Sequence, residues 1–403
     1  MRINKLNKAI LYTLVLLLPT SCHWFSKKDG EIGKSLLMYM AVTSNLSGSI
    51  SMNMEDVENS PFVPEYFEYP KESGDILLLL EHKEKSIPKL KRLYRDEFGE
   101  IQEEILQEYD GESSIDPEFM QEVLSYANNI FPAKERGIIF SSHGTGWTPE
   151  GYYKNPTKDG ITPASALREE DPYAHLVKSF GQIDGQEMDM VQMAASIPSG
   201  YSYIIFDACL MGGIEVAYEL KDKTAYTLLS PTEIMAAGFP YGDLMEQVFY
   251  SEGSLVNRLS ALARCYYDYY SDPDTGGGTI TLVRSDKLPA VASAVKSILS
   301  KDRSAINDLN MNSLQGYFRG SIRHWFYDMT DFMESVSSDP AMLDAYKKAM
   351  DEAVVVKYAT DKFLSIAINT YCGLSMYVPK PANPFLDEYY KKYSWNSAVN
   401  LVE

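Results

Sequence analysis

Short runs of almost unbroken apolar residues recur along the first half of the chain, each bounded by glycine, proline or polar residues. The runs are SLLMYMAV at 35–42, DILLLLEH at 75–82, RGIIFSSHG at 136–144 and YSYIIFDAC at 201–209. Runs of this length fit strands whose two faces are both covered, as in a parallel sheet. We therefore expect a buried β-strand at each of them.

Between these runs, apolar residues recur with the spacing of amphipathic helices. Helices are expected at 116–131, 189–197, 213–222 and 243–270. Because strands and helices alternate, the pattern predicts an α/β sandwich with a mostly parallel sheet.

The second half of the chain continues with a further strand pattern and further helical patterns. A strand is expected at 276–285, helices near 288–301 and 340–353, and a late strand in CGLSMYVP at 372–379. Periodicity leaves open whether the part from about residue 250 is a subdomain or extends the same sheet.

The N-terminus has the order of a secretory signal peptide. Basic residues precede the apolar run AILYTLVLLL, and the small-residue stretch PTSC closes at Cys22. The run is shorter than the roughly 20 residues that cross a bilayer. We expect a signal peptide at 1–21, a polar tether at 22–34 and the folded domain at 35–403.

Cys22 also has a possible role in membrane attachment. PTSC resembles the lipobox of bacterial lipoproteins, in which the cysteine is lipidated, and this implies an exported protein anchored at the outer membrane or cell surface. An ordinary cysteine after a cleavage site is the alternative. The remaining Cys209, Cys265 and Cys372 are an odd number, so at least one thiol stays unpaired, and their spacing gives no zinc motif.

Charge bears on the choice of partners. Lysine and arginine number 37 against 56 aspartate and glutamate, which gives a formal net charge of -19. Nucleic acid is therefore not an expected partner, and cationic ligands are favoured.

Two potential catalytic residues follow expected strands. His143 comes directly after one apolar run, in a turn with Gly144 and Gly146, and Cys209 ends another run before a Gly-Gly turn and a helical pattern. The carboxyl ends of parallel strands meet at one edge of a sheet, and a helix N-terminus lowers the pKa of a thiol. The pattern fits a nucleophile with its base, and equally a buried core thiol beside a structural histidine.

The sequence around these residues is similar to that of a known family. SSHGTGW and FDACLMGGIEVAYEL resemble the His-Gly and Asp-Ala-Cys motifs of the clostripain family of cysteine peptidases. The resemblance continues in KSFGQID, LLSPTEIMAAGFPY, FYDMTDF and CGLSMYVP. It implies a caspase-haemoglobinase-like three-layer α/β/α sandwich and an endopeptidase that cleaves after Arg or Lys. A catalytically inactive surface module that binds peptides or proteins on the same fold is the alternative.

The resemblance also implies roles for single residues. Cys209 matches the nucleophile and His143 the catalytic acid or base, and together they form the family's dyad. Backbone N–H groups of Gly144 and Cys209 would then stabilise the oxyanion. Asp207 matches the acidic residue that binds a basic P1 side chain, with a turn-capping aspartate as the alternative.

No metal site is expected, although some family members need calcium. Asp272 and Asp274 in SDPDTGGG have metal-like spacing, but no glutamate follows at the twelfth position of an EF-hand loop. We expect a hairpin turn there, and a calcium requirement stays open.

The long segment between His143 and the Cys209 strand is a candidate for self-cleavage, as in relatives of the family. It contains the basic residues Lys154, Lys158, Arg168 and Lys178. Lys158 and Lys154 rank first because they lie near Pro156 and Gly160 in a stretch expected to be flexible. An uncut segment that lines the cleft is the alternative.

Overall fold

The computed structural model describes residues 30–42, 47–83, 86–110, 113–142, 144–152, 155–161, 177–178, 188–319 and 325–403. Its centre is a nine-stranded sheet with the order β12-β10-β8-β7-β5-β1-β2-β3-β4. The strands are β1 (Ile32–Val42), β2 (Gly74–Lys83), β3 (Lys89–Arg95), β4 (Ile101–Glu108), β5 (Ala133–Ser141), β7 (Tyr201–Asp207), β8 (Thr224–Leu229), β10 (Thr279–Arg284) and β12 (Val354–Ala359).

Parallel pairing holds the middle of this sheet. β8, β7, β5, β1 and β2 run parallel, whereas β3 and β4 on one side and β10 and β12 on the other are antiparallel additions. Each of the expected apolar runs of the first half lies in one of the parallel strands. The mostly parallel sheet predicted from the sequence is confirmed, and β10 and β12 continue it into the second half of the chain.

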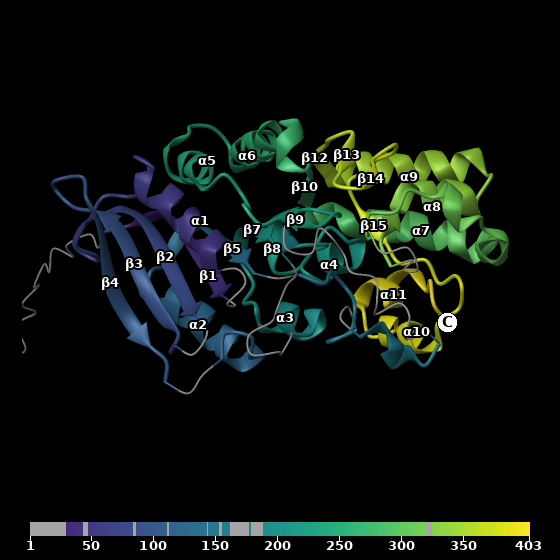
Figure 1. The fold of residues 1–403 in the computed structure, drawn as a ribbon, viewed down its shortest axis with the longest axis horizontal. Coiled ribbons are helices and arrows are strands. Elements are labelled where there is room, and N and C mark those ends of the chain that lie inside the picture. Colours follow the sequence, from purple (N-terminus) through teal and green to yellow (C-terminus); the bar gives the residue numbers. More distant parts are fainter. Residues whose placement is uncertain are drawn as a thin grey trace, which may run out of the picture.

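Helices cover both faces of the sheet, which gives three layers (Figure 1). One row contains α1 (Ser47–Asn59), α5 (Tyr241–Met245) and α6 (Leu255–Tyr270), which pack in sequence along one side. The other row contains α2 (Pro117–Ile130), α3 (Met190–Ser196), α4 (Ile214–Glu219) and α11 (Ser394–Val399). The expected α/β/α sandwich is therefore present.

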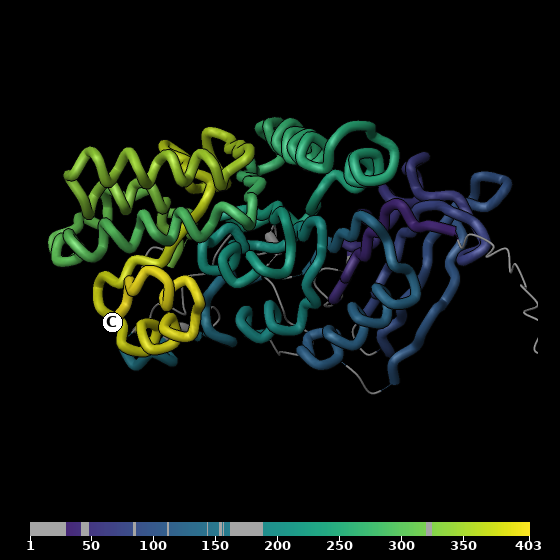
Figure 2. The backbone as a smooth tube through the Cα atoms, turned by 180° about the vertical axis from the view of Figure 1, so that it is seen from behind, coloured from purple at the N-terminus to yellow at the C-terminus, as the bar shows by residue number. Residues whose placement is uncertain are grey.

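The remaining elements gather around the C-terminal half. Helices α7 (Leu288–Asp302), α8 (Met329–Val336) and α9 (Pro340–Ala353) pack together, and α10 (Pro384–Tyr390) precedes α11. Seen from behind, the C-terminal residues lie against the middle of the molecule, where α11 contacts α4 (Figure 2). Two-residue strands pair as β6 (Val177–Lys178) with β9 (Ile234–Met235), β11 (Tyr327–Asp328) with β15 (Ser375–Met376), and β13 (Lys362–Phe363) with β14 (Ile366–Ala367).

The single helix expected at 243–270 is wrong. The chain forms α5, then a π-helical turn at Glu246–Tyr250, and then leaves the helix before α6 begins. Gly253 has φ 108°, which a residue with a side chain rarely adopts, and the Ser254 hydroxyl accepts from the Asn257 N–H to start α6. The Ser-Glu-Gly-Ser break thus divides one apolar pattern into two helices.

Two shorter expectations also differ from the structure. The hairpin turn expected at 271–278 is instead a connection from α6 to β10, in which Asp272 caps a 3₁₀ turn by accepting from the Asp274 N–H. The late strand expected at 372–379 is reduced to Ser375–Met376, because only these residues find a partner strand.

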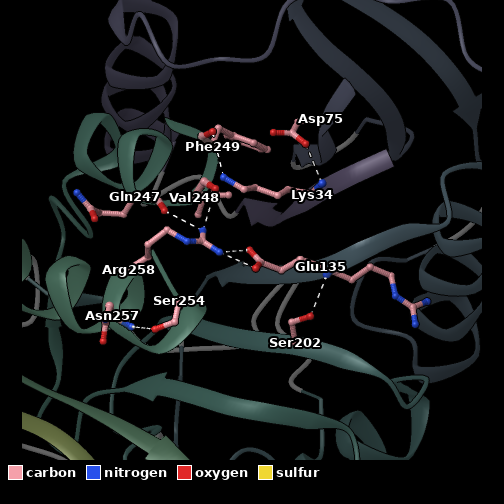
Figure 3. Close-up of polar contacts among 11 residues, drawn as sticks. Lys34, Asp75, Glu135, Ser202, Gln247, Val248, Phe249, Ser254, Asn257 and Arg258 are labelled. Carbon is pink, nitrogen blue, oxygen red and sulfur yellow. Dashed lines mark hydrogen bonds and ion pairs between the residues drawn. The ribbon is translucent and has the colours of Figure 1, made fainter. Parts of the chain in front are cut away.

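A partly buried cluster of charges joins α6 to the amino end of the sheet (Figure 3). Arg258 Nη2 lies 2.6 and 2.5 Å from the two carboxylate oxygens of Glu135 on β5. Its Nη1 lies 3.0 Å from two carbonyl oxygens of the turn 247–249, and Lys34 Nζ lies 3.1 Å from the third. A π-helical turn leaves carbonyl groups without helical partners, and buried ones need donors. The cluster supplies those donors.

Arg258→Ala should destabilise the fold strongly. The Arg258 side chain is only 5% exposed, so its loss leaves the Glu135 carboxylate and the turn carbonyls poorly solvated. We expect the free energy of unfolding in urea to fall by about 3–5 kcal/mol. Arg264→Ala on the same helix is the control, because Arg264 is 56% exposed and should cost at most about 1 kcal/mol. Equal losses in both variants would contradict a supporting role for the cluster.

Candidate active site

The site lies where β5 and β7 end side by side. In their parallel register Ser141 stands opposite Asp207, and the Ser141 hydroxyl donates a 2.8 Å hydrogen bond to Asp207 Oδ2. Cys209 follows this point closely on one strand, as does Gly144 on the other. The pairing therefore brings the segments that carry both candidate catalytic residues to one edge of the sheet, although His143 itself lies outside the described residues.

The Asp207 carboxylate is enclosed by protein. Its side chain has no exposed surface, and Tyr241 on α5 donates a second hydrogen bond of 2.9 Å to the same oxygen that Ser141 contacts. Burial, followed by the charge of Asp207, raises the pKa of Tyr241 well above its usual value, so the phenol remains a donor. Asp207 is thus held in place by hydroxyl groups from two elements.

The thiol of Cys209 is fully buried under a backbone segment. The Ile234 N–H donates to Cys209 Sγ at 3.2 Å, and the thiol lies 3.5 Å from the Ile234 carbonyl oxygen. Ile234 belongs to β9, which is itself paired with β6 through Lys178 opposite Ile234 and Val177 opposite Met235. A peptide that reaches the thiol must therefore displace β9 or its neighbours.

The loop after Cys209 is fastened from several directions. Leu210 has φ 63°, an unfavourable conformation for a branched apolar residue, and its N–H donates to the Thr232 carbonyl at 3.0 Å. Gly212 donates to the Ser230 carbonyl at 2.7 Å and accepts from the Ser375 N–H at 2.9 Å. These bonds hold a strained conformation directly beside the thiol.

The turn that follows His143 packs against this loop. Gly146 has φ 58°, and a Cβ there would come within 2.6 Å of the Leu210 carbonyl oxygen. Only glycine allows this approach without displacement of the backbone. Trp147, the next residue, is fully buried and donates to the Trp325 carbonyl at 2.9 Å, so it anchors the turn in the core. Gly144 is buried in the same turn.

Helix α4 begins at Ile214, so the loop 210–213 (the Cys209 loop) separates its N-terminus from Cys209. Glu215 in its first turn is fully buried and accepts from the Tyr377 N–H at 2.9 Å and the Tyr390 hydroxyl at 2.6 Å. Burial raises the pKa of Glu215 to about 7. This carboxyl therefore links helix α4, which follows the Cys209 loop, to the C-terminal part of the chain.

An ion pair near the thiol was not found from the sequence. Arg319 lies with Nε 2.5 Å from Glu233 Oε2 and Nη2 2.9 Å from Glu233 Oε1. The two side chains are 6% and 0% exposed. The stretch SPTEIM could have indicated this ion pair, because Glu233 is its one charged residue. Ser141 and Tyr241, the partners of Asp207, were missed as well.

Several other expectations lie beyond what the structure tests. Cys22, the lipidation candidate, is outside the described residues. In the described ranges, no three His, Cys, Asp or Glu side chains are grouped to hold a metal ion. No helix among the described residues is long and apolar enough to cross a membrane.

Comparisons with known proteins agree on one family. The family model described as the clostripain family matches residues 38–159 and 187–400. The chain is similar to the solved structure of an inactive zymogen of a C11 protease from Parabacteroides distasonis, with 27% identity, a TM-score of 0.74, and 91% of this chain and 97% of that chain covered. It is also similar in fold to a secreted C11 cysteine protease from Bacteroides thetaiotaomicron in complex with an irreversible peptide inhibitor, with 24% identity, a TM-score of 0.72, and 91% and 99% coverage. The search of curated proteins found no match.

Glu215 should make stability depend on pH. Its pKa is about 7 in the folded protein, above the ordinary value of 4.5, so the folded state retains a proton that the unfolded state has lost. The free energy of unfolding should therefore fall as pH rises from 4.5 through about 7, by up to about 3 kcal/mol.

Glu215→Gln should remove this part of the pH dependence, because the amide oxygen can accept both existing hydrogen bonds and does not titrate. Denaturant unfolding at pH 5 and pH 8 measures the effect. Glu219→Gln, at a partly exposed position of the same helix, is the control and should keep the wild-type difference. A Glu215→Gln protein with an unchanged difference between the two pH values would contradict the assignment.

Proposed function

Since the chain belongs to the clostripain family and is a cysteine-type peptidase, we propose that Cys209 and His143 form a dyad that hydrolyses polypeptides after Arg or Lys. The observation that carries this proposal is the parallel register of β5 and β7. It brings Cys209 and the turn that follows His143 to one edge of the sheet. The close contact of Gly146 with the Leu210 carbonyl supports the same juxtaposition.

The proposed reaction is acyl transfer to sulfur followed by hydrolysis. The Cys209 thiolate attacks the scissile carbonyl carbon, and the C–N bond breaks as His143 gives a proton to the leaving amine. Water then attacks the thioester, His143 takes its proton, and the acid product leaves as the thiolate forms again. N–H groups of Gly144 and Cys209 would stabilise the oxyanion in both steps.

The preference for a basic P1 residue rests on acidic side chains near the thiol. Asp207 lies two positions before Cys209 and is held by two hydroxyl groups. A carboxylate in such a place can pair with a guanidinium or ammonium group. In the closed arrangement Asp207 is enclosed, so binding of P1 requires the site to open.

The setting of this reaction is the cell envelope or its outside. A signal peptide at 1–21 and lipidation of Cys22 would export the chain and anchor it in a membrane. Its substrates would then be exported or extracellular proteins and peptides with Arg or Lys at P1. The net charge of -19 argues against nucleic acid as a partner.

We also propose that the enzyme activates itself by cutting the chain before the Cys209 strand. The buried thiol supports this, because β6 and β9 lie over it. Lys178 is paired with Ile234, the residue that contacts Cys209 Sγ. Lys158 instead lies in the turn Pro156–Asp159, whose Asp159 is bound by Asn383. These positions favour Lys178 over Lys158, the reverse of the order expected from the sequence.

Cys209→Ala and His143→Ala should each abolish turnover. We expect kcat for fluorogenic peptides with Arg or Lys at P1 to fall by about 10³-fold or more in either variant, with no further loss in the double variant. Cys265→Ala on α6 is the control and should retain activity. If the wild type cleaves neither peptide, with or without calcium and reductant, the chain is a binding module and not an active peptidase.

Lys178→Ala should block self-cleavage. Intact-mass measurement should give two fragments for the wild type and for Lys158→Ala, and one full-length species for Lys178→Ala and for Cys209→Ala. A Lys178→Ala protein that is cut as completely as the wild type would place the processing site elsewhere. One species in the wild type, under conditions where peptides are hydrolysed, would exclude self-cleavage.

A further inference from the structure

In the Glu233–Arg319 ion pair a carboxylate binds a guanidinium group, the same pair of groups that would meet when the enzyme binds a substrate arginine. A guanidinium group contacts both oxygens of a fully buried carboxylate, at 2.5 and 2.9 Å. This two-point contact is the geometry by which a carboxylate binds an arginine side chain. Removal of both charges from water is costly, so the pair contributes less to stability than its short distances indicate.

The position of Glu233 is next to the nucleophile. The residue before it, Thr232, accepts from the Leu210 N–H through its carbonyl, and the residue after it, Ile234, donates to Cys209 Sγ. Glu233 therefore stands between two backbone contacts to Cys209 and its successor.

Arg319 reaches Glu233 from a different part of the chain. It lies two residues after Tyr317, whose N–H donates to the Phe326 carbonyl, and a Cβ placed on Gly146 would lie 2.7 Å from the Phe326 ring. Gly146 belongs to the turn after His143. The ion pair thus connects the segment that contacts Cys209 with the segment that packs near the turn after His143.

We propose that Glu233 is a specificity-determining carboxylate for the basic P1 side chain, and that Arg319 occupies its place in the closed enzyme. This inference rests on the proposed cleavage after Arg or Lys and names a residue that recognises P1 in addition to Asp207. A substrate arginine would exchange with Arg319 on Glu233, one guanidinium for another, so the buried carboxylate keeps a cation throughout the exchange.

The closed arrangement couples this exchange to β9. Glu233 directly precedes Ile234, and Ile234 is paired with Lys178 in β6. Release of β6 frees one edge of β9 and allows the backbone beside Glu233 to move. The same movement would act on the thiol, because Ile234 contacts Cys209 Sγ through its N–H and its carbonyl oxygen. Access to the nucleophile and access to Glu233 therefore open together.

The experiment measures peptide binding without turnover. The Cys209→Ala protein cannot cut itself, so full-length Cys209→Ala chains are first cut by added wild-type enzyme. The affinities of two peptides, one with Arg at P1 and one with norleucine, are then compared by fluorescence anisotropy. Arg319→Gln should raise the preference for the Arg peptide by about tenfold or more, because the Arg319 guanidinium then no longer competes for the Glu233 carboxylate. Glu233→Gln should reduce that preference to near equality. Arg284→Gln, at an exposed ion pair with Asp286, is the control and should change neither affinity.

Two results would overturn the proposal. One is an Arg319→Gln protein that binds both peptides with equally changed affinity, and the other is a Glu233→Gln protein that keeps the full preference for Arg. Either result would mean that the ion pair only stabilises the fold by joining the two segments. Arg319→Lys keeps a cation without the planar fork and should show an intermediate preference if Arg319→Gln folds poorly. Failure of the proposed function appears separately, as lack of cleavage by the wild type, because binding to Cys209→Ala needs no chemistry.

Discussion

Parallel pairing of β5 with β7 is the constraint on which the rest of the site depends. Ser141 and Asp207 are direct neighbours across this pairing, and the hydrogen bond between them is possible only in this register. A slip by one residue would turn Asp207 to the opposite face of the sheet and break its contacts with Ser141 and Tyr241. It would also shift Cys209 relative to the turn that begins at Gly144. The register of the strands therefore sets the relative positions of the site residues, and the loops are built on it.

The segment that covers Cys209 is held by stronger interactions than those made by the thiol itself. The contacts of Cys209 Sγ with Ile234 are sulfur hydrogen bonds at 3.2 and 3.5 Å, and such bonds are weak. The Glu233–Arg319 ion pair and the β6–β9 pairing hold the same segment through charge-assisted and backbone hydrogen bonds. The stronger contacts that would have to break to expose Cys209 therefore lie beside the thiol and not on it. The proposed cut at β6 would lower that barrier without any change at Cys209.

The sequence predicts the buried part of this fold well and its polar edges poorly. Continuous apolar runs identified β1, β2, β5 and β7, because strands covered on both faces need apolar residues throughout. β3 and β4 read KLKRLYR and IQEEILQE and were missed: β4 is an edge strand and β3 lies next to it, and charged residues hide the alternation of both. The break at Gly253 in the helix expected at 243–270 was also missed, because the apolar pattern is helical both before and after it.

Support for the Cys209 loop could not be predicted, because it comes from residues far away in the sequence. Ser375 bonds to Gly212, and Tyr377 and Tyr390 bond to Glu215, so the last part of the chain fastens the segment just after Cys209. Motifs near Cys209 give no indication of these partners. Because β10 and β12 extend the same sheet, this C-terminal part cannot be treated as an appendage. It keeps the strained Leu210 beside the thiol in place, and a strained conformation persists only where its surroundings determine it from several sides.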